Sequence, residues 1–346
     1  MQMIAVEEAK PGMVLAKPIL RKIDGLVLLQ DNIILKQNYI EKIKTLNLDS
    51  IWVKDLGESD ESDVLEPIRE ETRLKATAIL RTTFNQCKQE QTIDTVKLKE
   101  VVKEILDYIL SDLRIVYSLT KINNYDNYTF THSVDVCVLS VLIGSVMGIS
   151  RNELEILGIS AMLHDIGKIF SDFRILNKPA KLKPDEYELI KTHTRDGYEL
   201  LKKRGNVSFL VPHMALQHHE RENGSGYPRG LSSRRIHRFA KIIAVADVFD
   251  AMTSQRIYQN PVSFQAAIED IRNHTPLQYN QSVVESLTKI ITPYERGSKL
   301  MLSNHQKVEV TSISRTKCLV RVVSGYPEGE IFDLYKKPEL SVVRVL

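Results

Sequence analysis

The residues best suited to chemistry in this sequence of 346 residues are histidines and aspartates placed at wide intervals. The set contains five of the nine histidines and consists of His132, His164, Asp165, His193, His218, His219 and Asp247. Imidazole and carboxylate ligands together suit iron, manganese or zinc, whereas an all-oxygen set would suit magnesium. These residue types therefore raise the prediction of a metal centre.

Each residue has a plainer interpretation when it is taken alone. His132 could cap a helix or sit in the core, and His193 could lie on the surface. Adjacent imidazoles at His218 and His219 near an apolar face need partners or a metal ion to offset desolvation. Asp247 lies within "IIAVADVFDAM", where a lone carboxylate is costly unless it is paired or bound to metal. Because the plain interpretations require several independent coincidences, we favour one shared metal centre.

Helical patterns dominate the part of the chain that carries these residues. In "LKEVVKEILDYILSDL" (98–113) the apolar positions recur every three or four residues, which predicts an amphipathic helix. A helical bundle can bring distant side chains together on its inner side. The expected fold is mainly α. The two helices before residue 120 either pack within this domain or form the seam of a homodimer.

Two smaller units flank the helical region. The first has a turn at 11–13, a hairpin signal at "DG" (24–25), a helix near 37–46 and a strand at 50–53, which together predict a small α/β unit. After Gly297 short alternating runs predict strands. The expected division is an α/β domain at 1–54, an acidic linker at 55–67, the helical domain at 68–296 and a β unit at 297–346.

Composition narrows the class of protein. A net charge of +3 gives no reason to expect polymeric nucleic acid or an anionic membrane as a partner. The three cysteines lie far apart and fit a reducing cytoplasm rather than a disulfide framework or a zinc site. The apolar run at 136–150 is shorter than the roughly 20 residues of a membrane span, and the first residues lack a secretory pattern. We expect a soluble, cytoplasmic protein.

Three motifs resemble one known family. "HDIGK" (164–168), "HHERENGSGYP" (218–228) and "AVADVFDAMTSQRIY" (244–258) are similar to the HD-GYP branch of the HD phosphohydrolases, in order and at family-like separations. The resemblance runs from about Tyr125 to Tyr258 and more loosely to Pro293. A second Gly-Tyr-Pro at 325–327 has no histidines nearby, and we interpret it as a turn. The first 54 residues loosely resemble a small domain that often precedes such modules.

The resemblance implies a metal-dependent phosphodiesterase that hydrolyses cyclic di-GMP. Its two divalent ions, of iron or manganese type, would activate a bridging hydroxide for attack on the phosphodiester. One half-site would consist of His132, His164, Asp165 and Asp247. The second half-site would be completed by His193, His218 and His219. The product would be pGpG, with GMP as a further product.

Other residues are expected to contact the substrate. Lys168 lies close enough to His164 to supply positive charge to the phosphate, and it shares the catalytic role with Asp165 in this interpretation. By resemblance, Asp126 and Arg256 touch the nucleotide, and Arg256 could hold the second phosphate. Tyr227 could stack on a base. The alternatives are a solvated lysine, a helix cap at Asp126, a surface salt bridge at Arg256 and simple packing of Tyr227.

The sequence departs from the family pattern in three places. Tyr128 stands where some members have a glutamate for a third metal, so we expect two metals. Asn223 replaces the usual aspartate before Gly224, with little effect expected because asparagine tolerates the same turn. Gln259 replaces a basic residue, which could weaken binding of the second phosphate and leave pGpG as the main product.

Two other functions remain open at this stage. The metal centre could act on another cyclic dinucleotide or nucleotide, because no residue identifies guanine. Alternatively, the domain could sense cyclic di-GMP, or bind a protein partner through its Gly-Tyr-Pro loop, without turnover. The complete set of metal ligands argues for catalysis.

Overall fold

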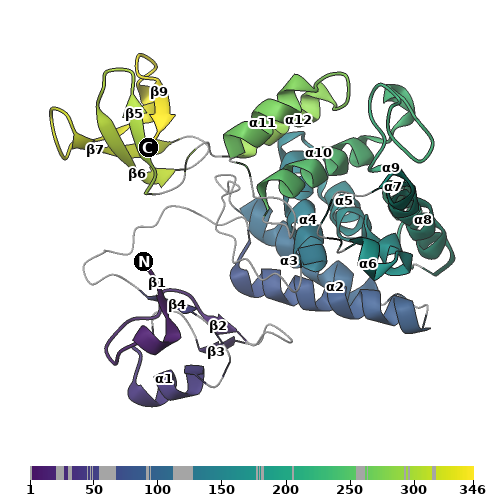
Figure 1. Ribbon diagram of the computed structural model, residues 1–346, viewed down its shortest axis with the longest axis horizontal. Helices are drawn as coiled ribbons and strands as arrows, with labels where there is room; N and C mark the ends of the chain where they lie inside the picture. Colours follow the sequence, from purple (N-terminus) through teal and green to yellow (C-terminus); the bar gives the residue numbers. More distant parts are fainter. Residues whose placement is uncertain are drawn as a thin grey trace.

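The chain forms a helical bundle flanked by two small units that contain strands (Figure 1). The computed structural model describes residues 2–20, 27–29, 33–44, 50–53, 68–90, 95–111, 128–176, 183–204, 206–254, 264–291, 297–313 and 317–346, with a few single residues between them. The mainly α fold expected from the sequence is confirmed. The expected "DG" turn and the acidic linker fall outside the described residues.

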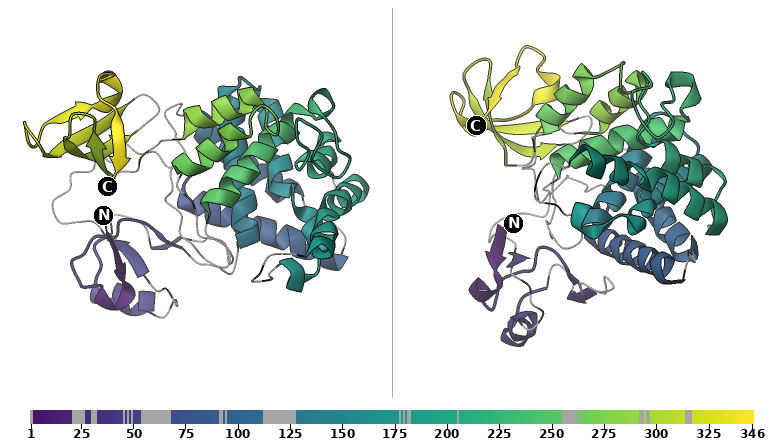
Figure 2. Two further views of the ribbon diagram at one scale, coloured as in Figure 1. Left: turned by 45° about the horizontal axis from the view of Figure 1, so that its top comes forward. Right: turned by 45° about the vertical axis from the view of Figure 1, so that its right-hand side comes forward.

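Within the described residues, apolar side chains gather into three separate clusters. The largest draws its members from the helical region, between Ile68 and Ile291. A second cluster runs from Val6 to Val53, and a third runs from Leu300 to Leu334. The turned views in Figure 2 draw the two terminal units as bodies distinct from the bundle. Each cluster therefore draws its members from one continuous part of the sequence.

The N-terminal unit is built from two short antiparallel pairs and one helix. Strand β1 (Gln2–Ala5) pairs with β4 (Ser50–Val53), and β2 (Ile19–Leu20) pairs with β3 (Val27–Leu29). The short 3₁₀ helix η1 (Val6–Glu8) follows β1 directly. Helix α1 (Gln37–Lys44) buries Ile40 and Ile43 against this unit. Hence the predicted strand at 50–53 is confirmed, and the predicted helix ends slightly earlier than expected.

The helical region carries the candidate ligands. Its elements are α2 (Glu70–Glu90), α3 (Thr95–Ser111), α4 (Tyr128–Val146), α5 (Arg151–Leu163), η3 (Ile166–Phe170), α6 (Phe173–Leu176), α7 (Pro184–Lys191), α8 (His193–Arg204), α9 (Leu210–Gln217), η4 (Ser233–Arg235), α10 (Arg238–Thr253), α11 (Phe264–Asn273) and α12 (Gln281–Ile290).

Helix α4 forms the centre of the bundle. It packs against α2, α3, α5, α10 and α12. Its stretch Thr129–Val146 is long and apolar enough to cross a membrane, with a mean hydropathy of 1.5, but 72% of that stretch is buried inside the protein. A helix that is apolar on every side lies either in a protein core or in lipid. Here the surrounding helices account for the apolar character of α4.

Helices α2 and α3 pack within the same domain. The apolar positions of α3 predicted from the sequence, from Leu98 to Ile109, are buried. Each buried aliphatic side chain of this size contributes about 1.5–3 kcal/mol to folding. On α2, Arg73 forms a salt bridge with Asp135 of α4, which ties α2 to the helix that carries His132. The intradomain alternative therefore accounts for the apolar face of α3 without a partner subunit.

A close approach between η3 and α8 depends on a glycine. A side-chain carbon at Gly167 would overlap the backbone oxygen of His193 and lie 2.6 Å from the backbone nitrogen of Gly197. Only glycine has no side chain to clash at such a crossing. As a result, the start of α8 packs directly against the segment that follows Asp165.

The C-terminal unit is a five-stranded antiparallel sheet. Its strand order is β8-β7-β6-β5-β9. The strands are β5 (Lys299–Leu302), β6 (Lys307–Ile313), β7 (Cys318–Ser324), β8 (Ile331–Asp333) and β9 (Val342–Val345), with the short 3₁₀ helix η5 (Leu334–Lys336) after β8. Alternate residues of β6 and β7 are buried, which confirms the strands expected from their alternating pattern.

Candidate metal centre

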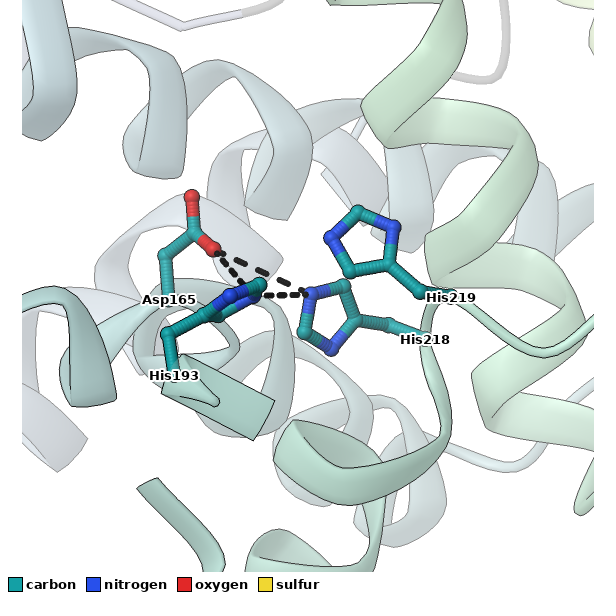
Figure 3. Close-up of side chains that lie close together, drawn as sticks. All are labelled: Asp165, His193, His218 and His219. Atoms are coloured by element: carbon teal, nitrogen blue, oxygen red, sulfur yellow. Dashed lines mark hydrogen bonds and ion pairs between the residues drawn. The ribbon is translucent and has the colours of Figure 1, made fainter. Parts of the chain in front are cut away.

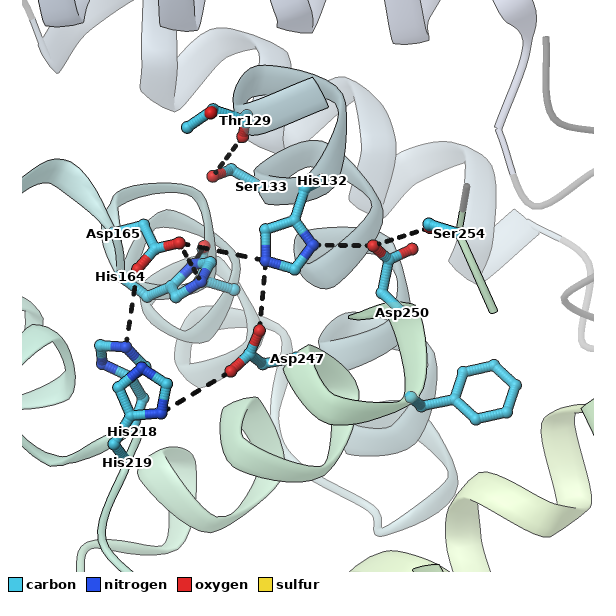
Figure 4. A network of polar contacts seen from close by, with 12 residues as sticks. Thr129, His132, Ser133, His164, Asp165, His218, His219, Asp247, Asp250 and Ser254 are labelled. Carbon is cyan, nitrogen blue, oxygen red and sulfur yellow. Dashed lines mark hydrogen bonds and ion pairs between the residues drawn. The ribbon is translucent and has the colours of Figure 1, made fainter. Parts of the chain in front are cut away.

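The scattered candidate ligands converge inside the helical bundle. They come from three helices and from the ends of two others: His132 from α4, His193 from the start of α8, Asp247 from α10, His164 and Asp165 from the end of α5, and His218 and His219 from the residues after α9 (Figures 3 and 4). All are buried except His219, which is partly buried. Segments far apart in the sequence therefore bring their imidazoles and carboxylates to one place.

Asp165 joins two groups of ligand atoms. In one group its carboxylate meets His193, His218 and His219 (Figure 3), and in the other it meets His132 and His164 (Figure 4). Within each group the candidate atoms lie within 4.8 Å of one another. The Oδ1 atom of Asp165 lies 3.3 Å from Nε2 of His193, while Oδ2 lies 3.3 Å from Nε2 of His164. Each oxygen of one carboxylate thus faces a different group.

Asp247 lies between the same two groups on another side. Its Oδ1 is 3.1 Å from Nε2 of His132, and its Oδ2 is 3.9 Å from Nδ1 of His219. The first contact agrees with the half-site that the family resemblance gives to Asp247. The second contact brings the same carboxylate to the edge of the other half-site.

Backbone carbonyls set the tautomers of three histidines. The Nδ1 atoms of His164, His193 and His218 lie 2.7, 2.6 and 2.9 Å from the carbonyl oxygens of Ala161, Ile190 and Ala215. A carbonyl oxygen only accepts hydrogen bonds, so each Nδ1 must donate its proton. In the neutral ring the Nε2 lone pair is then available as a metal ligand.

The inward-facing atoms fit a bound cation. Among the residues that the structure describes, the buried Nε2 of His164 and Oδ1 of Asp165 have no hydrogen-bond partner. The Nε2 atoms of His193 and His218 face each other at 3.3 Å. Buried acceptors without donors are rare, and two lone pairs at this distance repel unless a positive charge lies near them. The cluster therefore has the ligand atoms of a divalent metal site, and its buried acceptor atoms lack the positive charge that such a metal would supply.

Burial and mutual charge keep most of these groups in the form that binds metal. Burial, followed by the neighbouring imidazoles, holds the pKa values of His218 and His219 well below the usual range. Burial opposes ionisation of Asp165, but Lys168 and His164 outweigh it and hold its pKa well below normal. The centre thus combines neutral imidazoles with ionised carboxylates, as metal ligation requires.

His132 differs from His193, His218 and His219, whose pKa values burial lowers. Burial disfavours its charged form, but hydrogen bonds with Asp247 and Asp250 outweigh burial and raise the pKa of His132. The same contact with His132 outweighs burial at Asp247 and holds the pKa of that carboxyl well below its usual range. This side of the centre is therefore richer in negative charge than the side formed by His193, His218 and His219.

Lys168 lies at the edge of the cluster. Its ammonium forms an ion pair with Oδ2 of Asp165, and its side chain is 27% exposed. It is therefore a positioned cation next to a candidate ligand rather than a freely solvated lysine. A ligand phosphate that reached Asp165 would come within range of this charge.

Of the remaining predicted substrate contacts, the structure describes Tyr227 but neither Asp126 nor Arg256. The ring of Tyr227 stacks on His219 with 4.6 Å between centroids, so it packs against a candidate ligand. Asp126, Arg256 and Gln259 lie outside the described residues, and their predicted roles stay predictions. Tyr128 begins α4, one helical turn before His132.

Two buried carboxylates near this centre were not among the site residues predicted from the sequence. Asp250 accepts a hydrogen bond from Nδ1 of His132 at 2.7 Å. The carboxylate of Glu220 accepts hydrogen bonds from the backbone N–H groups of Arg229 and Leu231 at 2.9 and 2.7 Å. These bonds join the two ends of the loop that contains Tyr227. The available signal for Asp250 was a second carboxylate three residues after Asp247, on the same helical face.

Most of the helical region matches a known protein family. The model of the HD domain family matches residues 121–283. A cyclic di-GMP phosphodiesterase of Pseudomonas aeruginosa is 33% identical over 230 residues, covering 66% of this chain and 55% of the relative. A cyclic di-GMP phosphodiesterase of Thermotoga maritima is 36% identical over 228 residues, covering 63% of this chain and 61% of the relative. The chain thus spans somewhat more than half the length of these relatives.

A solved structure shares the fold over most of the chain. Bd1817, described as an HDGYP protein of Bdellovibrio bacteriovorus, superposes with a TM-score of 0.56 at 17% sequence identity. The superposition covers 84% of this chain and 98% of that protein. At this identity the likeness concerns the fold alone.

Proposed function

We propose that the chain, whose residues 121–283 match the HD domain family, belongs to the HD-GYP group and is a metal-dependent phosphodiesterase that hydrolyses cyclic di-GMP. The observation that carries this proposal is the buried cluster in which Asp165 faces two groups of imidazoles. Its acceptor atoms include His164 Nε2 and Asp165 Oδ1, which lack donors among the described residues. A catalytic metal pair would satisfy them.

We propose that the centre holds two divalent ions of iron or manganese type. Mixed imidazole and carboxylate ligands favour these metals over magnesium. His132, His164, Asp165 and Asp247 would hold one ion, and Asp165 with His193, His218 and His219 would hold the other, as their grouping supports. When bound, the ions would supply Lewis-acid chemistry that activates water and holds the phosphate oxygens.

The protein's own side chains would orient and balance the substrate. The ammonium of Lys168 lies beside Asp165, where it can offset the charge that builds up on a phosphate under attack. Tyr227, packed on His219, would give one wall of the space next to the centre. The product expected is pGpG, with slower release of GMP, because Gln259 stands where a basic residue is usual.

The surroundings of the site also support two wider proposals. The three apolar clusters support a division into domains at 1–54, 68–296 and 297–346, joined by the acidic linker at 55–67. All three cysteines are buried and none forms a disulfide in the part of the chain that the structure describes, which supports a cytoplasmic location.

The decisive experiment couples metal analysis to turnover. Protein purified without oxygen should carry about two iron or manganese ions per chain, and it should convert cyclic di-GMP to pGpG in a chromatographic assay. An Asp165→Asn variant should lose both, because Asp165 faces both groups. Faster turnover of a mixed cyclic dinucleotide would redirect the substrate assignment. Metal-loaded protein that binds cyclic di-GMP without cleaving it would instead indicate a sensing module.

A further inference from the structure

His132 has an unusual partner behind it. Asp250 lies three residues after Asp247 on α10 and is fully buried. Its Oδ2 accepts a hydrogen bond from Nδ1 of His132 at 2.7 Å and a second from the hydroxyl of Ser254 at 3.0 Å (Figure 4). The carboxylate is therefore held from one side by a hydroxyl while it holds the imidazole from the other.

The other ligating histidines are supported differently. Behind His164, His193 and His218 the Nδ1 proton goes to a backbone carbonyl, which is neutral. Behind His132 it goes to a buried carboxylate. A carboxylate behind a ligating imidazole fixes the orientation of the ring and makes its far nitrogen a stronger electron donor than a carbonyl does. His132 should therefore be the strongest imidazole ligand of the set.

The position of this pair divides the centre into unequal halves. Nε2 of His132 lies 3.1 Å from Oδ1 of Asp247, so this ring has a carboxylate at each nitrogen. The half formed by His193, His218 and His219 shares Asp165 but has neutral carbonyls behind His193 and His218. A cation bound beside His132 and Asp247 would experience more negative charge in a low-dielectric setting than one beside His193 and His218.

We propose that Asp250 is a positioning residue that orients His132 and makes the half-site of His132, His164, Asp165 and Asp247 the tighter of two metal sites. Ser254 fixes the carboxylate of Asp250 in the geometry that this requires. The inference rests on the proposed metal centre. Its consequence is ordered loading, in which the His132 half-site fills before the His193 half-site.

Direct titration of metal-free protein with Mn²⁺ tests this inference. Free Mn²⁺ is followed by electron paramagnetic resonance, so the readout does not depend on turnover. The wild type should show two sites of different affinity. Asp250→Asn keeps the shape of the side chain but removes its charge, and it should weaken Mn²⁺ affinity at the tighter site about 10-fold. Asp250→Ala should weaken that affinity by up to about 100-fold. Ser254→Ala should weaken that site by about 3-fold.

A matched control separates positioning from general loss of packing. Thr253 is buried on the same helix, and its hydroxyl bonds to the carbonyl of Phe249 rather than to a candidate ligand. Thr253→Val should leave both affinities unchanged. In a His132→Ala background only the weaker site should remain, and Asp250→Asn should not alter its affinity further.

The possible outcomes distinguish this inference from the proposed function. Two unequal sites, with the tighter one weakened selectively by Asp250→Asn, would support it. Unchanged affinities in folded Asp250→Asn, or equal weakening of both sites, would overturn the role of Asp250 and leave the metal centre in place. Wild-type protein that binds no Mn²⁺, Fe²⁺ or Zn²⁺ would overturn the proposed function and this inference together.

Discussion

The same tripeptide occurs twice in this protein in opposite surroundings. Gly226-Tyr227-Pro228 lies beside the metal centre, whereas Gly325-Tyr326-Pro327 lies between β7 and β8 of the C-terminal sheet. Both have a cis Tyr–Pro bond. Tyr227 stacks on His219, while Tyr326 is 93% exposed. Three identical residues therefore do not by themselves define a functional loop.

The difference lies in what each loop contacts. Gly226 packs so tightly on the backbone of His219 and Arg221 that a side-chain carbon would overlap it. The carboxylate of Glu220 accepts two backbone hydrogen bonds from the residues that follow the tripeptide. At the second tripeptide, Gln306 Nε2 donates to the carbonyl of Tyr326 at 3.0 Å, and the backbone N–H of Glu330 donates to the carbonyl of Pro327 at 3.4 Å. The first loop is thus part of the wall of the site, and the second is a surface turn.

The largest difference between the loops should come from their glycines. Gly226→Ala should lower metal-dependent turnover about 100-fold, because the added carbon would displace the backbone of His219 and misplace a ligand. Gly325→Ala should cost about 1–2 kcal/mol of stability, because Gly325 has a φ of 116°, but it should leave turnover unchanged. Turnover assays and thermal melts of both variants check this. Wild-type activity in Gly226→Ala would contradict it.

The glutamates near the loops should differ next most strongly. Glu220→Ala leaves the backbone N–H groups of Arg229 and Leu231, the second of them buried, without their acceptor, so it should lower the free energy of unfolding by about 2 kcal/mol. Glu328→Ala, at an exposed position of the second loop, should change it by less than about 0.5 kcal/mol. Urea denaturation measures both. Equal values for the two variants would mean that Glu220 does not hold the loop.

The tyrosines should give a smaller contrast. Tyr227→Ala removes the ring that packs on His219 and should weaken metal-dependent turnover about 10-fold, equivalent to the loss of one good aromatic contact. Tyr326→Ala removes an exposed ring and should have no measurable effect on turnover. Steady-state kinetics of the two variants provide the test. A Tyr227→Ala enzyme as active as the wild type would show that this ring only fills space.

The smallest effect is expected at the start of the first loop. Oδ1 of Asn223 accepts hydrogen bonds from the backbone N–H and the hydroxyl of Ser225 at 3.0 and 2.7 Å. A carboxylate can accept the same two bonds. Asn223→Asp should therefore change turnover by less than about 2-fold, as the family pattern also implies. A larger change, measured under the same conditions as the wild type, would give this position a role beyond the turn.

Residue type and spacing picked out the histidines and aspartates that the fold brings together, but not the groups that contact them from behind. Asp247 was identifiable because a carboxylate inside an apolar run needs a reason to be there. Asp250, in the same run, could not be linked to His132 because 118 residues separate them and only the packing of α10 on α4 brings them together. Glu220 was hidden in the same way, since its partners are backbone groups that every residue has.

Local patterns predicted the helices and strands well where one face is buried. The periodic spacing in α3 and the alternation in β6 both match the observed burial. Helix α4 is apolar on most sides, so its pattern did not indicate which face meets which neighbour. That assignment depends on the tertiary packing of several helices at once.

The buried thiols have a practical consequence for following these loops. Burial raises the pKa of Cys87 to about 11 and those of Cys137 and Cys318 to about 12, so less than about one thiol in a thousand is ionised at pH 7.5. Maleimide dyes should therefore leave the native chain unlabelled. A single cysteine introduced by Arg229→Cys or Tyr326→Cys would accept the dye alone, and its fluorescence anisotropy would compare the tumbling of the two loops in solution.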